Sequence, residues 1–171
     1  MSETRPSELT RPPPKAVAES KTELSELMIP NHANFSGNVH GGILLMLLDR
    51  AAYITACKHS NHYCVTASVD RVDFHDAIKV GSVLHLFASV NYVGRSSMEI
   101  GIRVQTEDFH RGEFKHTNTC FFTMVAVDED GRPVPVPELK LETEEDRRRF
   151  EAGHERALRR KEDRRARLKQ H

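Results

Sequence analysis

The first third of the chain contains one long apolar run, residues 43–57. Within this run only Asp49, Arg50 and Thr55 are clearly polar. A helix that is apolar on every face is normally buried in a protein core, and this run is too short and too charged to span a bilayer. The pattern therefore predicts a central helix that is packed inside the fold and ends near residue 58.

The central helix carries a carboxylate, Asp49, which we expect to be buried with it. Burying a carboxylate without a partner costs several kcal/mol, so the residue needs either a counter-ion or a chemical role. On the residues alone, an ion pair between Asp49 and Arg50 or Arg71 is as well supported as a catalytic function.

Beyond the helix, apolar and polar residues alternate with a period of two, which predicts strands at residues 63–70, 84–92 and 98–105. The last two of these strands flank a run of turn residues, an arrangement that is typical of an antiparallel hairpin. Two more strands are predicted, a short one at 24–29 and a central one, apolar on both faces, at 120–127. A single antiparallel sheet with one buried helix on its concave face is an α+β fold.

The two ends of the chain differ from this middle part. Residues 1–21 are polar and contain several prolines, which predicts a flexible tail. Residues 140–171 form a charged, helix-prone run in which Thr143 and Asp146 resemble a capping box. We expect a C-terminal helix that lies on the surface or extends away from the body. The globular domain then spans residues 22–139.

Composition narrows the class of protein. A chain of 171 residues suits one domain with tails, and a formal net charge of zero gives no global field directed at nucleic acid or membrane. The three cysteines lie in apolar segments without metal or redox spacing, as in reduced cytosolic proteins. No signal or membrane-spanning segment is present in the sequence, and we predict a cytoplasmic protein without membrane partners.

Metal and nucleic-acid binding are not favoured by the remaining motifs. The histidines do not follow a metal-ligand spacing, so we predict no metal. Basic runs near the C-terminus lack the interleaved aromatic residues on which bases stack, which favours a solvated or inter-subunit helix over a nucleic-acid partner.

Four ordered motifs carry a resemblance to a known family. They are N-x-x-G-N-V-H-G-G followed by L-L-x-x-x-D at residues 34–49, C-V-T-A-S-V-D at 64–70, V-G-R-S-S-M-E-I at 93–100 and T-x-x-F-T-M-V-A-V-D at 119–128. Together they resemble the hotdog-fold acyl-CoA thioesterases of the YciA and brain acyl-CoA hydrolase type, over residues 22–137. The resemblance implies a hotdog fold, in which an antiparallel sheet wraps around one long buried helix.

The resemblance also implies an activity in fatty acid metabolism, the hydrolysis of acyl-CoA thioesters to a free acid and coenzyme A. In that family a carboxylate on the central helix and an earlier asparagine perform the reaction, and they match Asp49 and Asn34. The two halves of a site come from different protomers, which implies a homodimer, and relatives are commonly trimers of dimers, or hexamers. No cofactor is implied beyond the coenzyme A of the substrate and product.

Physical chemistry gives each matched residue a role. The amides at the start of the helix, near His40, Gly41 and Gly42, carry partial positive charge and can form an oxyanion hole. Asp49 can act as a general base on water or attack the thioester directly, and both routes stay open. Asn34 can orient water, hold the carbonyl, or only cap the turn.

Two further sets of residues are candidates for substrate binding. The hydroxyls of Thr66 and Ser68 can position water, and the turn of Arg95, Ser96 and Ser97 suits the phosphates of coenzyme A or is a plain hairpin turn. The alternative function is a non-catalytic hotdog module that senses acyl-CoA, but such a protein would be expected to have lost the pair that this chain retains.

Overall fold

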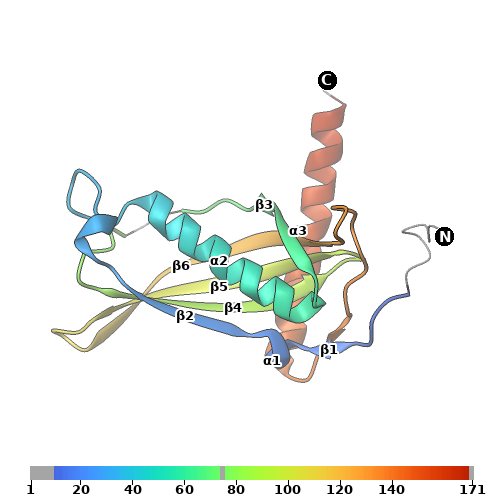
Figure 1. Ribbon diagram of the computed structural model, residues 1–171, viewed down its shortest axis with the longest axis horizontal. Helices are drawn as coiled ribbons and strands as arrows, with labels where there is room; N and C mark the ends of the chain where they lie inside the picture. The colour runs from blue at the N-terminus through green and yellow to red at the C-terminus, as the bar shows by residue number, and fades with distance from the viewer. Residues whose placement is uncertain (1–9, 74–75, 170–171) are drawn as a thin grey trace.

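The computed structural model describes residues 10–73 and 76–169. Five antiparallel strands form one sheet in the order β2-β4-β5-β6-β3, and the sheet curls around the long helix α2 (Figure 1). These elements are β2 Thr22–Leu27, α2 Gly41–Ser60, β3 Tyr63–Val69, β4 Val83–Val93, β5 Ser97–Asp108 and β6 Glu113–Val127. The predicted α+β architecture of a sheet wrapped around one helix is confirmed.

The smaller elements tie both ends of the chain to this body. They are β1 Lys15–Ala16, α1 Val17–Ser20, the 3-10 helix η1 Pro30–His32, β7 Leu139–Lys140 and the C-terminal helix α3 Glu144–Leu168. Strand β1 pairs in parallel with β7. The structure thus joins the segment before β2 to the segment after β6.

The prediction of a flexible tail over residues 1–21 is wrong for the part that the structure describes. Val17 is 3% exposed and Ser20 is fully buried. The backbone amide of Lys15 donates to the carbonyl of Glu138 at 2.9 Å. The polar composition of the segment did not indicate this docking, because the apolar residues that it buries, Ala16 and Val17, are few and small. Residues 1–9 lie outside the described part of the chain.

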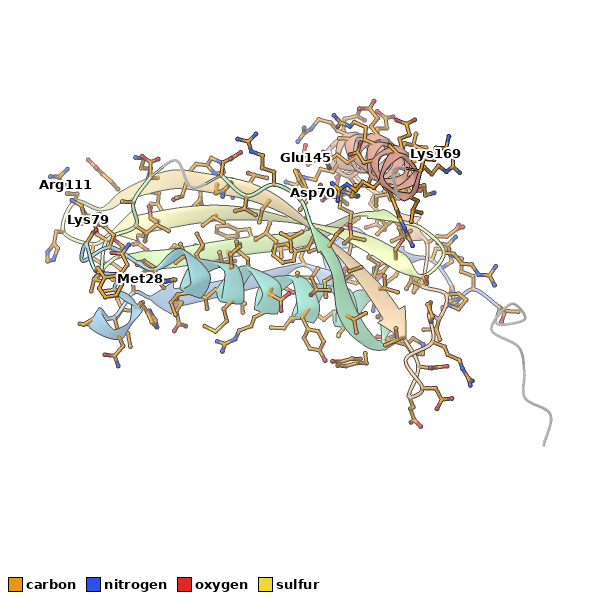
Figure 2. The ribbon with its side chains drawn as sticks, turned by 90° about the horizontal axis from the view of Figure 1, so that it is seen from above. Met28, Asp70, Lys79, Arg111, Glu145 and Lys169 are labelled. Atoms are coloured by element: carbon orange, nitrogen blue, oxygen red, sulfur yellow. The ribbon has the colours of Figure 1, made fainter. Side chains whose placement is uncertain are left out.

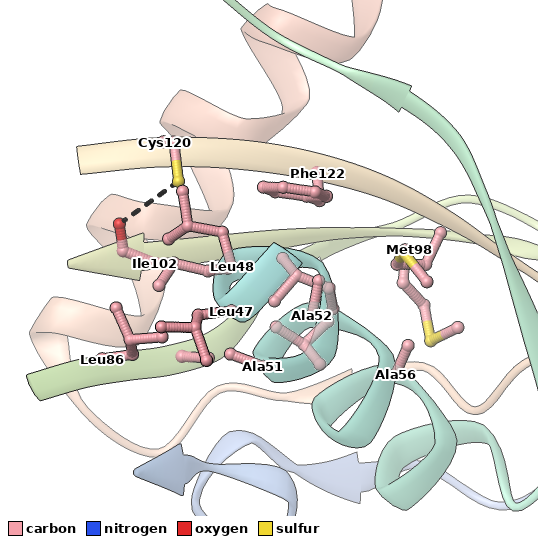
Figure 3. Close-up of a cluster of buried hydrophobic side chains, with 14 of the residues drawn as sticks. Leu47, Leu48, Ala51, Ala52, Ala56, Leu86, Met98, Ile102, Cys120 and Phe122 are labelled. Carbon is pink, nitrogen blue, oxygen red and sulfur yellow. Dashed lines mark hydrogen bonds between the residues drawn. The ribbon is translucent and has the colours of Figure 1, made fainter. Parts of the chain in front are cut away.

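The core lies between one face of α2 and the concave face of the sheet. Figure 3 shows Leu47, Leu48, Ala51, Ala52 and Ala56 of the helix directed at side chains of β4, β5 and β6. The apolar positions of β5, Met98, Ile100, Ile102 and Val104, are all fully buried, as the alternating pattern predicts. Each large side chain buried in this way contributes about 1.5–3 kcal/mol to the stability of the fold.

The opposite face of α2 is not covered in the isolated chain. Leu45, Met46 and Tyr53 are 38–40% exposed, and Asp49 and Arg50 on the same face are also exposed. The prediction that the helix is buried on every face, with a buried Asp49, is therefore wrong for a single chain. The reason is that the sheet curls over one side of the helix, and none of the described residues forms a layer on its second side.

Helix α3 packs on the outer face of the sheet, opposite to α2 (Figure 2). The side chain of Glu99 in β5 is 1% exposed and pairs with Arg156 and Arg160 of α3, each at 2.7 Å. Arg160 also pairs with Asp70 at 2.7 Å. The sequence did not predict this buried ion pair, because Glu99 reads as a solvent-facing position in an alternating strand.

The predicted C-terminal helix and its capping box are confirmed. The Thr143 hydroxyl accepts a hydrogen bond from the amide of Asp146 at 3.0 Å, and the Asp146 carboxylate accepts one from the amide of Thr143 at 3.0 Å. Residues 161–169 are exposed, and in Figure 1 this end of α3 extends beyond the sheet. None of the described helices is long and apolar enough to cross a membrane.

Candidate active site

The loop before α2 is held in shape by the side chain of Asn34. Its Oδ1 accepts hydrogen bonds from the backbone amides of Ser36, at 2.9 Å, and Asn38, at 3.1 Å. The amide of Asn34 donates in turn to the carbonyl of Asn38 at 2.6 Å, and Gly37 takes a positive φ of 77° that closes the turn. Asn34 therefore caps this loop, which was one of the roles expected for it.

Capping also fixes which way the Asn34 amide points. Because two backbone N–H groups donate to Oδ1, the Nδ2 group is directed away from the loop. Within the described residues Nδ2 makes no hydrogen bond. The sequence left open whether Asn34 would offer a ligand a hydrogen-bond donor or an acceptor. In this geometry the loop uses the acceptor, and the Nδ2 donor is left.

His40 caps the N-terminus of α2. Its Nδ1 accepts a hydrogen bond from the amide of Gly42 at 2.9 Å, so a neutral ring carries its proton on Nε2. The amide of Gly41 makes no hydrogen bond among the residues that the structure describes. Of the amides predicted for an oxyanion hole, that of Gly42 donates to the His40 ring and that of His40 donates to the carbonyl of His32 at 2.8 Å, so the amide of Gly41 is the one without an acceptor in the described residues.

Asp49 lies on the uncovered face of α2 and is bound by Thr66. The Thr66 hydroxyl, from β3, donates to Asp49 Oδ1 at 2.6 Å, a short charge-assisted hydrogen bond. No ion pair of Asp49 occurs within residues 10–73 and 76–169. Arg71, one of its two suggested partners, instead pairs with Asp73 at 2.8 Å. A carboxylate without a counter-ion but with one oriented hydroxyl is suited to chemistry on a ligand.

The structure does not bring Ser68, the other predicted hydroxyl, into contact with Asp49. The register between β3 and β6 shifts between Thr66 and Ser68, so the regular alternation of faces is interrupted there. Ser68 is exposed, and no hydrogen bond joins it to Asp49 in the described part of the chain. Strict alternation would put Thr66 and Ser68 on the same face of the strand, so the sequence pattern could not have distinguished their positions.

The turn of Arg95, Ser96 and Ser97 lies at the far end of the sheet from the Asn34 loop. Its backbone is bound to β6 and to the segment that follows it, since Ser96 O accepts from the amide of Ala126 and Arg95 O from that of Val136, both at 2.9 Å. The Asn34 loop instead contacts residues 78 and 79, just before β4 begins. Strand β4 has 11 residues, which at about 3.3 Å each separate the two ends by roughly 35 Å.

An apolar surface surrounds Asp49 and continues onto the edge strand β3. It comprises Leu45, Met46 and Tyr53 of α2 with Tyr63, Val65 and Val69 of β3, all at least 38% exposed. The rings of Tyr53 and Tyr63 meet edge to face at 5.8 Å, which joins the two elements. We call these six residues the dimer face, because an unpaired edge strand with an apolar patch is a typical site of association.

Thiol and metal chemistry have little support at this site. Burial raises the pKa of both Cys64 and Cys120 to about 12, so these thiols do not supply a thiolate nucleophile near neutral pH. Within the described residues no group of three or more His, Cys, Asp or Glu side chains is arranged to hold a metal ion.

A curled antiparallel sheet around one helix, with a capped glycine loop and a carboxylate on that helix, defines a hotdog-type thioesterase architecture. The family model described as the thioesterase superfamily matches residues 36–112. Protein VdlD of Helicobacter pylori is 47% identical over 84% of this chain and 79% of that protein. The cytosolic acyl coenzyme A thioester hydrolase of Rattus norvegicus is 36% identical over 88% of this chain and 40% of its own length.

Solved structures of acyl-CoA thioesterases are also similar. A hexameric acyl-CoA thioesterase crystallised without ligand has 40% identity and a TM-score of 0.84, covering 88% of this chain and 97% of its own. The acyl-CoA hydrolase of Staphylococcus aureus, solved with butyryl coenzyme A and coenzyme A, has 35% identity and a TM-score of 0.84 over 92% of this chain and 96% of its own. The chain therefore belongs to the hotdog-fold acyl-CoA thioesterases of the thioesterase superfamily.

Proposed function

We propose that this protein hydrolyses acyl-CoA thioesters at Asp49, yielding a free carboxylic acid and coenzyme A. The observation that carries the proposal is the hydrogen bond from Thr66 to an Asp49 carboxylate that has no counter-ion in the described residues. Asp49 acts as the general base on water or as the nucleophile. The hydroxyl of Thr66 holds the carboxylate in one orientation for either route.

Solved variants of the Staphylococcus aureus enzyme support the choice of residues. In separate structures an asparagine, an aspartate and a threonine of that enzyme are each replaced by alanine. The replaced positions have the same separations along that chain as Asn34, Asp49 and Thr66 have along this one. The agreement supports placing these three residues in one site.

The donors around the site suit the charge that develops on the thioester oxygen. The Gly41 amide at the positive end of α2, the Asn34 Nδ2 group and the Nε2–H of a neutral His40 are each left to donate. Attack on the carbonyl carbon forms a tetrahedral oxyanion, which such donors stabilise. Its collapse breaks the carbon–sulfur bond and releases the thiolate of coenzyme A.

A homodimer completes the site. A second copy on the dimer face would bury Asp49 and exclude bulk water, which strengthens every electrostatic interaction there. Antiparallel pairing of two β3 edges would also set the Arg95 turn of one protomer beside the Asn34 loop of the other. Arg95, Ser96 and Ser97 could then bind the phosphates of a substrate whose acyl end reaches Asp49. The hexameric relative supports further assembly to a trimer of dimers.

No cofactor is needed for this chemistry, because water and the thioester are its only reactants. A cytoplasmic location stays a prediction, which the three free cysteines and the name of the cytosolic rat relative support.

The test is thiol release from a panel of acyl-CoAs of increasing chain length. Asp49→Asn keeps the shape of the side chain and its contact with Thr66 but removes the base, so kcat should fall about 10²–10⁴-fold. Asp130→Asn, at an exposed turn on another part of the surface, is the matched control and should keep the wild-type rate. A chelator should leave the wild-type rate unchanged.

Two results would contradict the proposal. An Asp49→Asn variant that releases thiol at the wild-type rate removes Asp49 from the mechanism. Tight binding of acyl-CoA by the wild-type protein without any thiol release would instead favour the alternative function, a non-catalytic module that senses acyl-CoA.

A further inference from the structure

A hollow lies on the other side of the sheet from Asp49. It is a cavity of about 700 Å³ between α3 and the outer faces of β4, β5 and β6, and we call it the α3 cavity. Figure 2 places α3 and α2 on opposite faces of the sheet. The sheet therefore separates this cavity from the Asp49 site of the same chain.

The floor of the α3 cavity is polar and buried. Ser89 and Asn91 of β4 are 3% and 5% exposed, and the Ser89 hydroxyl donates to Asn91 Oδ1 at 3.3 Å. This bond leaves Asn91 Nδ2, in a residue that lines the cavity, without a hydrogen-bond acceptor among the described residues. A Cβ at position 101 would lie 2.2 Å from that nitrogen, so the glycine there provides the space for it.

Ser89 and Asn91 are two residues apart and therefore share one face of β4, and the strand is irregular at Asn91. Its register with β5 shifts between Val90 and Tyr92, and Asn91 is the residue that this bulge inserts. Bulges redirect side chains and are common beside functional sites. The Asn91 amide nitrogen, which has no acceptor among the described residues, can therefore donate to a ligand in the cavity.

The walls of the cavity carry an excess of positive charge. Five basic residues line it against one acidic residue, Glu23: they are Lys21, Arg103, Arg148, Arg149 and Arg156. Three of these arginines pair with carboxylates on the same chain, Arg148 and Arg149 with Glu145 and Arg156 with Glu99. Two carboxylates thus offset the charge of these three arginines in part, and Glu99 is also shared with Arg160.

Arg103 and Lys21 provide the remaining charge. Arg103 stacks over the ring of Phe87 at 4.9 Å, which holds its guanidinium at the cavity. Neither side chain forms an ion pair with a carboxylate in the described part of the chain. Arg149 also donates to Ser89 at 3.0 Å, which links the charged wall to the polar floor.

From this arrangement we infer that the α3 cavity binds a small organic polyanion that carries phosphate or carboxylate groups. Planar guanidinium groups bind both kinds of anion through paired hydrogen bonds, and the Asn91 amide adds a donor at the floor. The volume lies within the usual range for small-molecule sites. The site is distinct from the proposed catalytic centre and does not depend on thioester hydrolysis.

The test is isothermal titration of the full-length protein at low ionic strength with pyrophosphate and, separately, with citrate. We expect saturable binding of at least one of them that weakens with added salt. The anion that binds with the lower Kd assigns the natural ligand to the phosphate or the carboxylate class. Asp49→Asn should bind the same anion with the wild-type Kd, which separates this inference from the proposed function.

Matched variants locate the binding. Arg103→Gln changes an exposed side chain whose interaction in the structure is with a ring, so the fold should be kept while Kd rises at least about tenfold. Arg149→Gln should have a similar effect, with circular dichroism as a check on α3. Arg111→Gln removes an exposed arginine at the distant β5–β6 hairpin and should leave Kd unchanged.

Three outcomes would overturn the inference. One is the absence of saturable binding by either anion. Another is an equal loss of affinity in Arg103→Gln and Arg111→Gln, which would indicate general attraction to a charged surface. The third is binding only after the oligomer dissociates, which would make the cavity part of a contact between copies.

Discussion

Asn34 combines two tasks that a sequence motif cannot separate. Its oxygen holds the loop through the amides of Ser36 and Asn38, and its nitrogen remains available as a donor. A substitution that alters only one of these atoms can divide the structural role from the chemical one.

Asn34→Asp is that substitution, because aspartate keeps an acceptor for the two amides and loses the NH₂ donor. We expect the melting temperature to stay near the wild-type value while kcat falls about 10²–10³-fold, the usual effect of losing one oxyanion donor. Asn34→Ala is the comparison variant, in which both the loop bonds and the donor are lost. If Asn34→Asp were fully active, the residue would be a loop cap only.

At this scale the motifs predicted residue types better than they predicted contacts. The pairing of Asn34 with Asp49 followed from the resemblance to the family, and Thr66 was named, together with Ser68, as a neighbour from the adjacent strand. That the ring of His40 binds the amide of Gly42 could not be read from the sequence, because a capping side chain is defined by its rotamer.

At the scale of elements, α3 shows the limit of pattern reasoning most clearly. Its helical content and its capping box were predicted, but its docking depends on Glu99, which is buried under Arg156 and Arg160. Alternation in β5 indicates two faces and cannot indicate that a distant charged helix covers the polar one. Close packing at Gly153 is part of the same contact.

Gly153→Ala tests how closely α3 must approach the sheet. The added Cβ would lie 2.8 Å from Tyr92 Cβ and 3.0 Å from a Glu99 carboxylate oxygen. Alanine improves helix propensity by up to about 1 kcal/mol, but Tyr92 Cβ is fixed to a strand backbone and cannot move away. We expect overpacking to prevail and the free energy of unfolding in urea to fall by about 1–3 kcal/mol.

The control for this variant is Glu151→Ala, at an exposed position on the same helix, which should change stability by less than about 0.5 kcal/mol. Hydrogen exchange adds a local measurement, since amides of α3 should exchange faster in Gly153→Ala. A variant as stable as the wild type would mean that α3 can shift on the sheet without cost.

At the scale of the whole molecule, the sequence predicted the layers but not their boundaries. The change of period from helix to strand gave the order of elements, and all five strands of the sheet were located. The docking of residues 15–20 was missed because few apolar residues carry it. The exposure of Asp49 was missed because periodicity identifies an apolar face and does not tell whether the same chain covers it.

That uncovered face is the basis of the last prediction. Val65 lies on the edge strand within the dimer face and is 38% exposed in the isolated chain. Val65→Asp would place a charge in an apolar interface, so the oligomer should dissociate into smaller species with lower thioesterase activity. Light scattering after gel filtration measures the mass, and thiol release measures the activity.

Phe109→Asp, at an exposed apolar position of the distant β5–β6 hairpin, is the control and should leave both the mass and the activity unchanged. If Val65→Asp kept the wild-type mass and rate, the second copy would have to lie elsewhere, and Asp49 would have to act while open to solvent.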